Sequence, residues 1–282
     1  MQGVVHFSER MLQHFKRVQA LIDQLDPEGE PEALTVPGSA RPHDAVIVFT
    51  GSFNPPTTAH IAMLQEARRY ARQHEPMHLY AAMSKHTVDK ESVERPLLLD
   101  RIVLLQKLLR RRVPDTGILL FNRGLYVDQA EAVQRSFPEV KRIFFLIGFD
   151  KIVQILDPHY YQDRDAALRD LFQQAELLVA PRGNDGEQEL EELIQQPQNR
   201  QFARYIHPLP LNRAYRDISS SQVRQRANRY QHEVPQEVQR FMRITRAYEP
   251  PLRQADGSET DYYGERMKSL AALMHRQPAS RR

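Results

Sequence analysis

The sequence predicts an α/β protein built on a doubly wound, mostly parallel sheet with flanking helices. From Ala45 onward, short apolar runs alternate with longer amphipathic segments, as in strands joined by crossover helices. The composition, 41% hydrophobic and 27% charged, is ordinary for a soluble globular protein. A chain of 282 residues can also bury a substantial core, and we expect one domain with elaborated ends.

A helix is expected over residues 8–25, where apolar residues recur at helical spacing and Ser8 can cap the start. Residues 26–43 contain four prolines and two glycines, which cannot sustain a long regular element. We therefore predict an N-terminal helix and linker at 1–43, a domain at 44–249 and a C-terminal extension at 250–282.

Within the domain, apolar runs predict strands and amphipathic runs predict helices. The expected strands are 45–49, 77–83, 117–121, 142–147 and 176–180. The expected helices are 58–74, 97–112, 126–136, 164–173, 187–195, 220–230 and 235–247, with a last one near 261–275 in the extension.

Composition excludes several classes of function. The chain has no cysteine, which excludes disulfides, thiolate metal sites and a cysteine nucleophile, and favours a cytoplasmic location. No run approaches the roughly 18 apolar residues of a membrane span, and the first residues lack a secretory signal pattern. A net charge of +3 suits anionic small molecules as readily as nucleic acid. The cluster at 110–112 is interpreted as a solvated helix end, so nucleic acid is the less favoured alternative and we expect no nucleic-acid partner.

The segment TGSFNPPTTAH (50–60) follows the first strand of the domain, at the sheet edge where ligands bind in such folds. Gly51 permits a tight turn, and Thr57 can open a helix whose free N–H groups and positive dipole end favour phosphate. His60, one turn later, can donate to phosphate oxygens. Taken alone, the segment is more typical of a polar loop with a capping threonine.

Two further segments could contact the same ligand. In DISSSQVRQRA (217–227), serines at a helix start supply a cap and hydroxyl donors, and Arg224 falls about one turn later. In FLIGFDKIVQILDP (145–158), Asp150 follows a strand and can either accept from ribose hydroxyls or cap the next helix. An ordinary serine-capped helix with a surface arginine remains the alternative for the first of them.

Two of these segments resemble the signatures of the nucleotidyltransferase superfamily. Thr57, Thr58, Ala59 and His60 resemble its His/Thr-x-Gly-His motif, and ISSSQVR resembles Ile-Ser-Ser-(Ser/Thr)-x-(Ile/Val)-Arg. The form GSFNPxT followed by His is most similar to nicotinamide or nicotinate mononucleotide adenylyltransferases. Ala59 departs from the usual glycine but keeps a small side chain, and the resemblance covers about residues 45–230.

The resemblance implies a Rossmann-like fold and an enzyme of NAD biosynthesis that transfers the AMP of ATP to a pyridine mononucleotide. The attacking phosphate is already an anion, so the chemistry needs alignment and charge stabilisation rather than a general base. Mg²⁺ would arrive with ATP, since no dense carboxylate cluster is visible in the sequence. The implied residues are His60, Thr57 and Arg224 for catalysis, Gly51, Ser52, Phe53, Gly148, Asp150, Arg182, Ser219, Ser220 and Ser221 for ATP, and Lys85 and Lys90 for the acceptor phosphate.

Other functions stay open. Relatives in the superfamily use CTP or pantetheine phosphate, and the motifs do not identify the acceptor. A nucleotide-binding module without turnover is a further alternative, because Ala59 departs from the motif. No Walker-type Gly-x4-Gly-Lys-Ser/Thr segment and no histidine spacing typical of a metal site occur. Nucleotides are the expected partners, and a homo-oligomer is not excluded.

Overall fold

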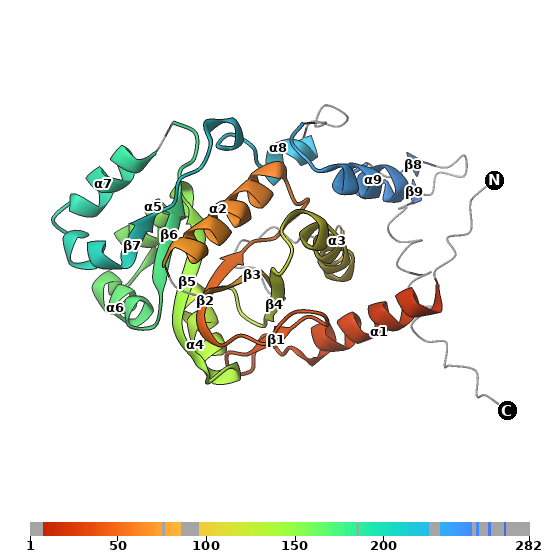
Figure 1. Ribbon diagram of the computed structural model, residues 1–282, viewed down its shortest axis with the longest axis horizontal. Helices are drawn as coiled ribbons and strands as arrows, with labels where there is room; N and C mark the ends of the chain where they lie inside the picture. The colour runs from red at the N-terminus through yellow and green to blue at the C-terminus, as the bar shows by residue number, and fades with distance from the viewer. Residues whose placement is uncertain are drawn as a thin grey trace.

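A computed structural model describes residues 8–74, 77–85, 96–184, 186–225, 232–249, 252–253, 259–260 and 268 of the chain (Figure 1). Its centre is a seven-stranded sheet in the order β1-β4-β3-β2-β5-β6-β7. The strands are β1 (Ala33–Thr35), β2 (Asp44–Thr50), β3 (Met77–Ser84), β4 (Gly117–Phe121), β5 (Val140–Gly148), β6 (Glu176–Ala180) and β7 (Ile206–Pro208). Strands β2 to β7 are parallel and β1 is antiparallel to β4.

The six parallel strands have the order of a dinucleotide-binding sheet, 3-2-1-4-5-6 when counted from β2. The predicted Rossmann-like, doubly wound fold is therefore confirmed. The helices are α1 (Glu9–Gln24), α2 (Thr58–His74), α3 (Leu98–Arg112), α4 (Tyr126–Ser136), α5 (Phe149–Leu156), α6 (Arg164–Gln174), α7 (Glu187–Gln195), α8 (Ser220–Gln225) and α9 (Gln236–Thr245). Short 3₁₀ turns lie at Pro158–Tyr160, Arg200–Tyr205 and Arg213–Tyr215, and β8 (Leu252–Arg253) pairs with β9 (Glu259–Thr260).

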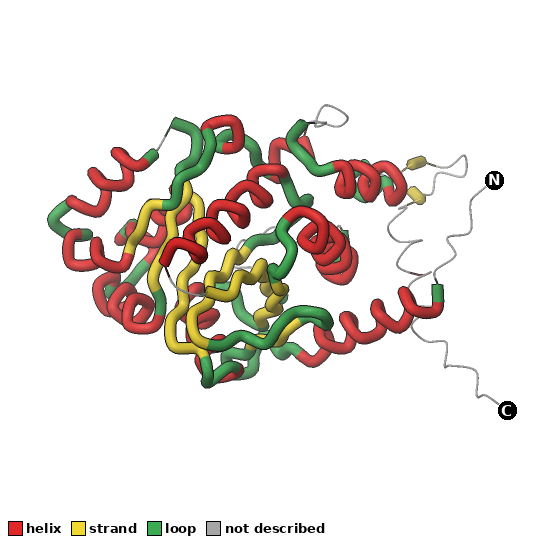
Figure 2. The backbone as a smooth tube through the Cα atoms, in the orientation of Figure 1, coloured by secondary structure: helices red, strands yellow, loops and turns green. Residues whose placement is uncertain are grey.

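Apolar side chains fill both faces of the sheet. Helices cover both of these faces, as Figure 2 shows. In β2, Ile47 and Phe49 join the core beneath α1, α2, α3 and α9, whereas Val46 and Val48 join the core beneath α4 to α7. Successive residues of a strand point to opposite faces, so a strand buried on both sides reads as a continuous apolar run. This explains why the runs in the sequence located the strands.

The predicted helix at 8–25 is confirmed as α1, with the N–H of Met11 donating to Oγ of Ser8 at 3.3 Å. The predicted linker holds a short strand, β1, that the proline-rich sequence did not indicate. Asn122, at the end of β4, fastens this segment by donating to the carbonyl oxygens of Asp26 at 2.7 Å and Glu30 at 2.8 Å. The division at residue 43 stays a prediction.

Two other elements differ from the sequence prediction. No strand was expected at β7. Helix α5 begins at Phe149 with Gly148 at its N-cap and no side-chain cap bond, so Asp150 lies within the first turn and does not cap the helix. The predicted helix 220–230 is described to Gln225, and most of the predicted helix 261–275 lies outside the described residues. Within the described part of the chain, no helix is long and apolar enough to cross a membrane.

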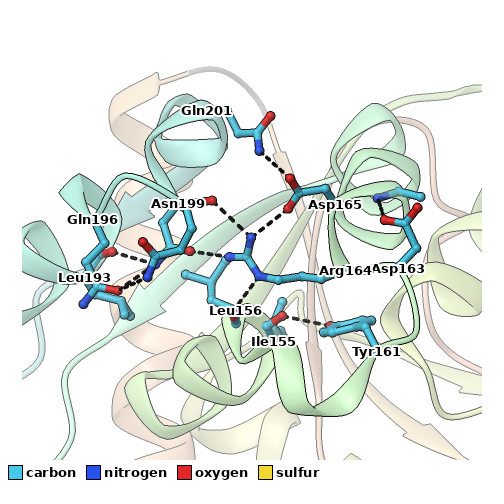
Figure 3. A network of polar contacts seen from close by, with 12 residues as sticks. Ile155, Leu156, Tyr161, Asp163, Arg164, Asp165, Leu193, Gln196, Asn199 and Gln201 are labelled. Carbon is cyan, nitrogen blue, oxygen red and sulfur yellow. Dashed lines mark hydrogen bonds and ion pairs between the residues drawn. The ribbon is translucent and has the colours of Figure 1, made fainter.

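A largely buried arginine ties α5 to the elements that follow it (Figure 3). Arg164 donates through Nε to the carbonyl oxygen of Leu156, the last residue of α5, at 2.8 Å. Its Nη1 donates to Asp165 at 2.8 Å and to the carbonyl oxygen of Gln198 at 3.1 Å, and its Nη2 donates to Asn199. The C-terminal end of α5 is thereby anchored, which steadies the helix whose first turn carries Asp150.

Candidate functional site

The crevice between β2 and β5 is where this fold is expected to bind ligands. The chain winds outward from these adjacent strands in opposite directions, so the loops beyond their carboxyl ends diverge and leave a crevice. The predicted segment 50–60 begins at Thr50, the last residue of β2, and β5 ends at Gly148 within the predicted segment 145–158.

The loop after β2 is held by contacts from β3 and α3. The N–H of Gly51 donates to the carbonyl oxygen of Ala82 at 3.0 Å, and the carbonyl oxygen of the exposed Ser52 accepts from Arg101 at 2.9 Å. Phe53 has a positive φ of 44°, in the left-handed region that few non-glycine residues adopt. Its ring is only 1% exposed, so the side chain supports the loop and can offer a nucleotide little beyond its backbone.

His60 is held as a neutral hydrogen-bond donor. The backbone N–H of Thr57 donates to its Nδ1 at 2.9 Å, and the Thr57 hydroxyl lies 2.7 Å from the same nitrogen. A backbone N–H can only donate, so the proton of the neutral imidazole is assigned to Nε2. Burial, and secondarily the charge of Arg182, lower the pKa of His60 to about 4.

The start of α2 differs from the expectation of free N–H groups facing a phosphate. The N–H of Thr57 is used by His60, and the N–H of Thr58 donates to the carbonyl oxygen of Glu233 at 2.8 Å. Thr57 is fully buried, so its hydroxyl lies against His60 instead of facing a ligand. The side chain of His60 is therefore the better placed donor at this helix start.

The second predicted segment meets the first. Ser219 and Gln222 form a reciprocal cap of α8, with two side-chain-to-backbone bonds of 3.2 Å. The hydroxyl of Ser220 donates to the carbonyl oxygen of Pro55 at 2.7 Å. Arg224 donates through Nη1 to the carbonyl oxygen of Asn54 at 2.7 Å and through Nη2 to Ser221 at 3.3 Å. The two signature segments thus lie together, as the sequence predicted.

Asp150 and Arg182 lie across the crevice from this junction. Arg182 Nε is 3.9 Å from Oδ2 of Asp150, both side chains being partly exposed. A Cβ added to Gly148 would come within 2.7 Å of Oδ1 of Asp150, so the glycine gives that carboxylate room to fold back. The phenol of Tyr126 lies close enough to Asp150 to be affected by its charge. Burial, and secondarily this charge, raise the pKa of Tyr126.

The two lysines expected at an acceptor phosphate are not brought to the crevice by any described contact. Nζ of Lys85 donates to the carbonyl oxygen of Leu25, just beyond α1, at 2.6 Å. This ammonium group therefore serves the packing of α1. Lys90 lies outside the described residues.

Several residues near the loop were missed by sequence reasoning. Tyr248 donates from its hydroxyl to Oδ1 of the buried Asn54 at 2.7 Å, and Arg101 reaches Ser52 from α3. Gln129 accepts from the Thr50 hydroxyl at 2.7 Å and so ties α4 to the end of β2. A charged residue within the apolar run LLLDRIVLL could have indicated Arg101, whereas Tyr248 and Gln129 leave no such signal.

A groove of about 540 Å³ borders the crevice. Its lining is mixed: apolar side chains such as Phe149, Val179, Leu190 and Pro208 to Leu211 alternate with the charged side chains of Glu66, Arg69, Glu187 and Arg216. Phe149 and Pro181, which line the groove, are the sequence neighbours of Asp150 and Arg182, whereas Asp150 and Arg182 themselves are not among its lining residues. Within the described residues, no group of three or more His, Asp or Glu side chains could hold a metal ion.

The protein is a doubly wound α/β protein in which the two predicted phosphate-binding segments meet at the switch point of the sheet. The chain belongs to the cytidylyltransferase-like family, whose family model matches residues 48–226 and so includes both signature segments. The protein is accordingly a nucleotidyltransferase by family.

Individual relatives are more distant. A Schizosaccharomyces pombe protein named "Putative nicotinamide mononucleotide adenylyltransferase" is 26% identical over 144 residues, covering 50% of this chain and 55% of the relative. The chain thus spans about half the length of this curated relative. A solved structure from Vibrio parahaemolyticus, described as "a Putative Nicotinate-nucleotide Adenylyltransferase", is 11% identical with a TM-score of 0.39, covering 71% of this chain and 99% of that one.

Proposed function

We propose that the protein is an adenylyltransferase that joins the AMP moiety of ATP to nicotinamide or nicotinate mononucleotide and releases pyrophosphate. The observation that carries this proposal is the junction of the two signature segments, where His60 and Arg224 flank one loop at the switch point. The resemblance of GSFNPPT and His60 to pyridine mononucleotide adenylyltransferases supports the acceptor, as does the name of the yeast relative.

The residues suit an in-line displacement. A phosphate oxygen of the mononucleotide bonds to the α-phosphorus of ATP, and the bond from that phosphorus to the bridging oxygen of pyrophosphate breaks. Nε2–H of His60 donates to an α-phosphate oxygen, and its bond strengthens as charge builds there. Arg224 and Ser221 hold the leaving pyrophosphate, and Arg182 offsets the repulsion between the two anionic substrates.

Other parts of the crevice bind the nucleoside. Asp150 accepts from ribose hydroxyls, and the groove lined by Phe149 takes the base. Mg²⁺ would be carried by ATP and would neutralise phosphate charge, because the described donors are hydroxyl, imidazole and guanidinium groups that fit anions. Thr57 acts indirectly, by fixing the tautomer of His60.

Turnover assays with a matched histidine control test the proposal. The protein is incubated with ATP, Mg²⁺ and either mononucleotide, and dinucleotide and pyrophosphate are measured. We expect His60→Ala to lower the rate about 100- to 1000-fold, in line with the loss of an oxyanion donor. His159→Ala, which removes an exposed imidazole on a 3₁₀ turn, should leave the rate unchanged. A loss below about tenfold in His60→Ala would contradict the role of His60.

A second candidate is transfer to a different acceptor, or from CTP. The family model that matches this chain is described as cytidylyltransferase-like and by itself names no adenylyl acceptor. Turnover with CTP, or with another phosphate acceptor but neither pyridine mononucleotide, would select this candidate. ATP binding by calorimetry without any pyrophosphate release would select a binding module.

A further inference from the structure

We propose that Tyr248 is a positioning residue for the phosphate-binding loop, residues 50–60. Residues 232–249, here called the brace, hold this loop in place. The inference rests on the proposed function. It concerns a part of the chain that follows residues 48–226, the region matched by the family model. The brace contacts the loop at two separated points.

The first contact joins Tyr248 to the arginine of the second signature. The phenol donates to Oδ1 of Asn54 at 2.7 Å, and the backbone carbonyl of the same Asn54 accepts from Arg224 at 2.7 Å. Asn54 is only 2% exposed, so solvent cannot readily replace either partner. One asparagine therefore links the phenol to the guanidinium.

The second contact lies at the other end of the loop. The carbonyl oxygen of Glu233 accepts from the N–H of Thr58 at 2.8 Å and from its hydroxyl at 3.1 Å. Thr58 begins α2, two residues before His60. The brace thus holds the loop on the side of Arg224 and on the side of His60.

The brace itself is anchored on α3. Glu237, whose side chain is only 4% exposed, pairs with Arg111 and Arg112 at 3.2 Å each, at the C-terminal end of α3. Val238 and Met242 of α9 are buried in the same core as α3. The first turn of α3 in turn holds Ser52 through Arg101. The phosphate-binding loop is consequently held by α3 and by the residues that flank α9 on either side, and α3 and α9 pack on each other (Figure 1).

The surroundings keep the phenol a donor. Burial raises the pKa of Tyr248, while the charges of Arg101 and Arg224 lower it and that of Asp100 raises it. These are the charged groups that face the phenol from α3 and α8. With the proton retained, the bond to Asn54 persists while Arg224 engages pyrophosphate. Misplacing a reacting group by about 1 Å can cost about 100-fold in rate, so a loop released on one side should lose rate.

The test compares Tyr248→Phe with Tyr80→Phe. Tyr80 is a buried tyrosine of β3 whose hydroxyl donates to the carbonyl oxygen of Ala40 at 3.2 Å, away from the crevice. For each variant we would measure thermal stability, the Kd for ATP by calorimetry, and kcat and KM for both substrates. We expect Tyr248→Phe to weaken ATP binding at least fivefold and to lower kcat about 10-fold, with the mononucleotide KM within twofold. Tyr80→Phe should change stability only.

The outcomes separate this inference from the proposed function. If Tyr248→Phe binds ATP with the Kd of the unchanged protein, or loses activity only in proportion to stability as Tyr80→Phe does, the positioning role is wrong. A fivefold difference in ATP Kd without turnover of either mononucleotide would support the brace and contradict the proposed acceptor. Failure of the unchanged protein to bind ATP would overturn both.

Discussion

Replacing His60 with glutamine should make the stability of the protein less dependent on pH. In the folded protein the pKa of His60 is lowered to about 4, whereas an unfolded histidine has a pKa near 6.5. Between these values the unfolded chain takes up a proton that the folded protein does not. The free energy of unfolding therefore falls as pH drops below about 6.5, and the loss is complete near pH 4. Glutamine does not titrate in this range.

The magnitude follows from the two pKa values. Lowering the pH from 8 to 5 would cost the folded protein about 2 kcal/mol through this single group, at about 1.4 kcal/mol per pKa unit. The imidazole is only half-buried, so solvent screens part of this effect. We expect about 1–2 kcal/mol more loss in the unchanged protein than in His60→Gln.

Urea denaturation at pH 8 and pH 5 measures this difference directly. The same titrations of other groups occur in both proteins and cancel in the comparison. A difference below about 0.5 kcal/mol, or one of opposite sign, would refute the assignment of His60 as a neutral residue held by burial. It would also remove the argument that Nε2 carries the proton offered to phosphate.

Two further predictions concern the two ends of α5, with Gly148 at its start and Arg164 bound to its end. Gly148→Ala places a methyl group where the carboxylate of Asp150 lies, so we expect kcat/KM for ATP to fall about 10-fold or more, as for one lost charged hydrogen bond, with little change in melting temperature. Unchanged kinetics would show that Asp150 does not bind the nucleotide. Arg164→Ala removes the largely buried guanidinium that Figure 3 shows, and urea denaturation should show a loss of about 2–4 kcal/mol, whereas a loss under 1 kcal/mol would contradict its anchoring role.

Apolar patterns were sufficient for the larger elements of the fold. The predicted helix at 97–112 is α3 at 98–112, because its apolar residues recur at helical spacing, and the predicted strand at 176–180 is β6, because it is a continuous buried apolar run. The short outer strands escaped this reasoning. Three residues cannot display a period, and β1 lies among prolines that favour a loop.

The candidate site was predictable only where its residues form a local pattern. His60 and Arg224 were found through two compact signatures, and the structure brings their segments together. The contact from Glu233 could not be predicted from the sequence, because it is made by a backbone carbonyl oxygen and every residue has one. Tyr248 could not be found from the sequence either, because its partner Asn54 lies nearly 200 residues earlier and only folding makes them neighbours.

The two outer strands of the sheet bear on how copies of this chain could associate. β1 and β7 are three residues long, and β7 ends at Pro208, which has no N–H to donate. A long, flat outer strand invites pairing with another molecule, and short strands and proline are common defences against it. In the described part of the chain, the sheet thus offers little template for edge-to-edge growth. A homo-oligomer built from these residues would have to join through helices or loops.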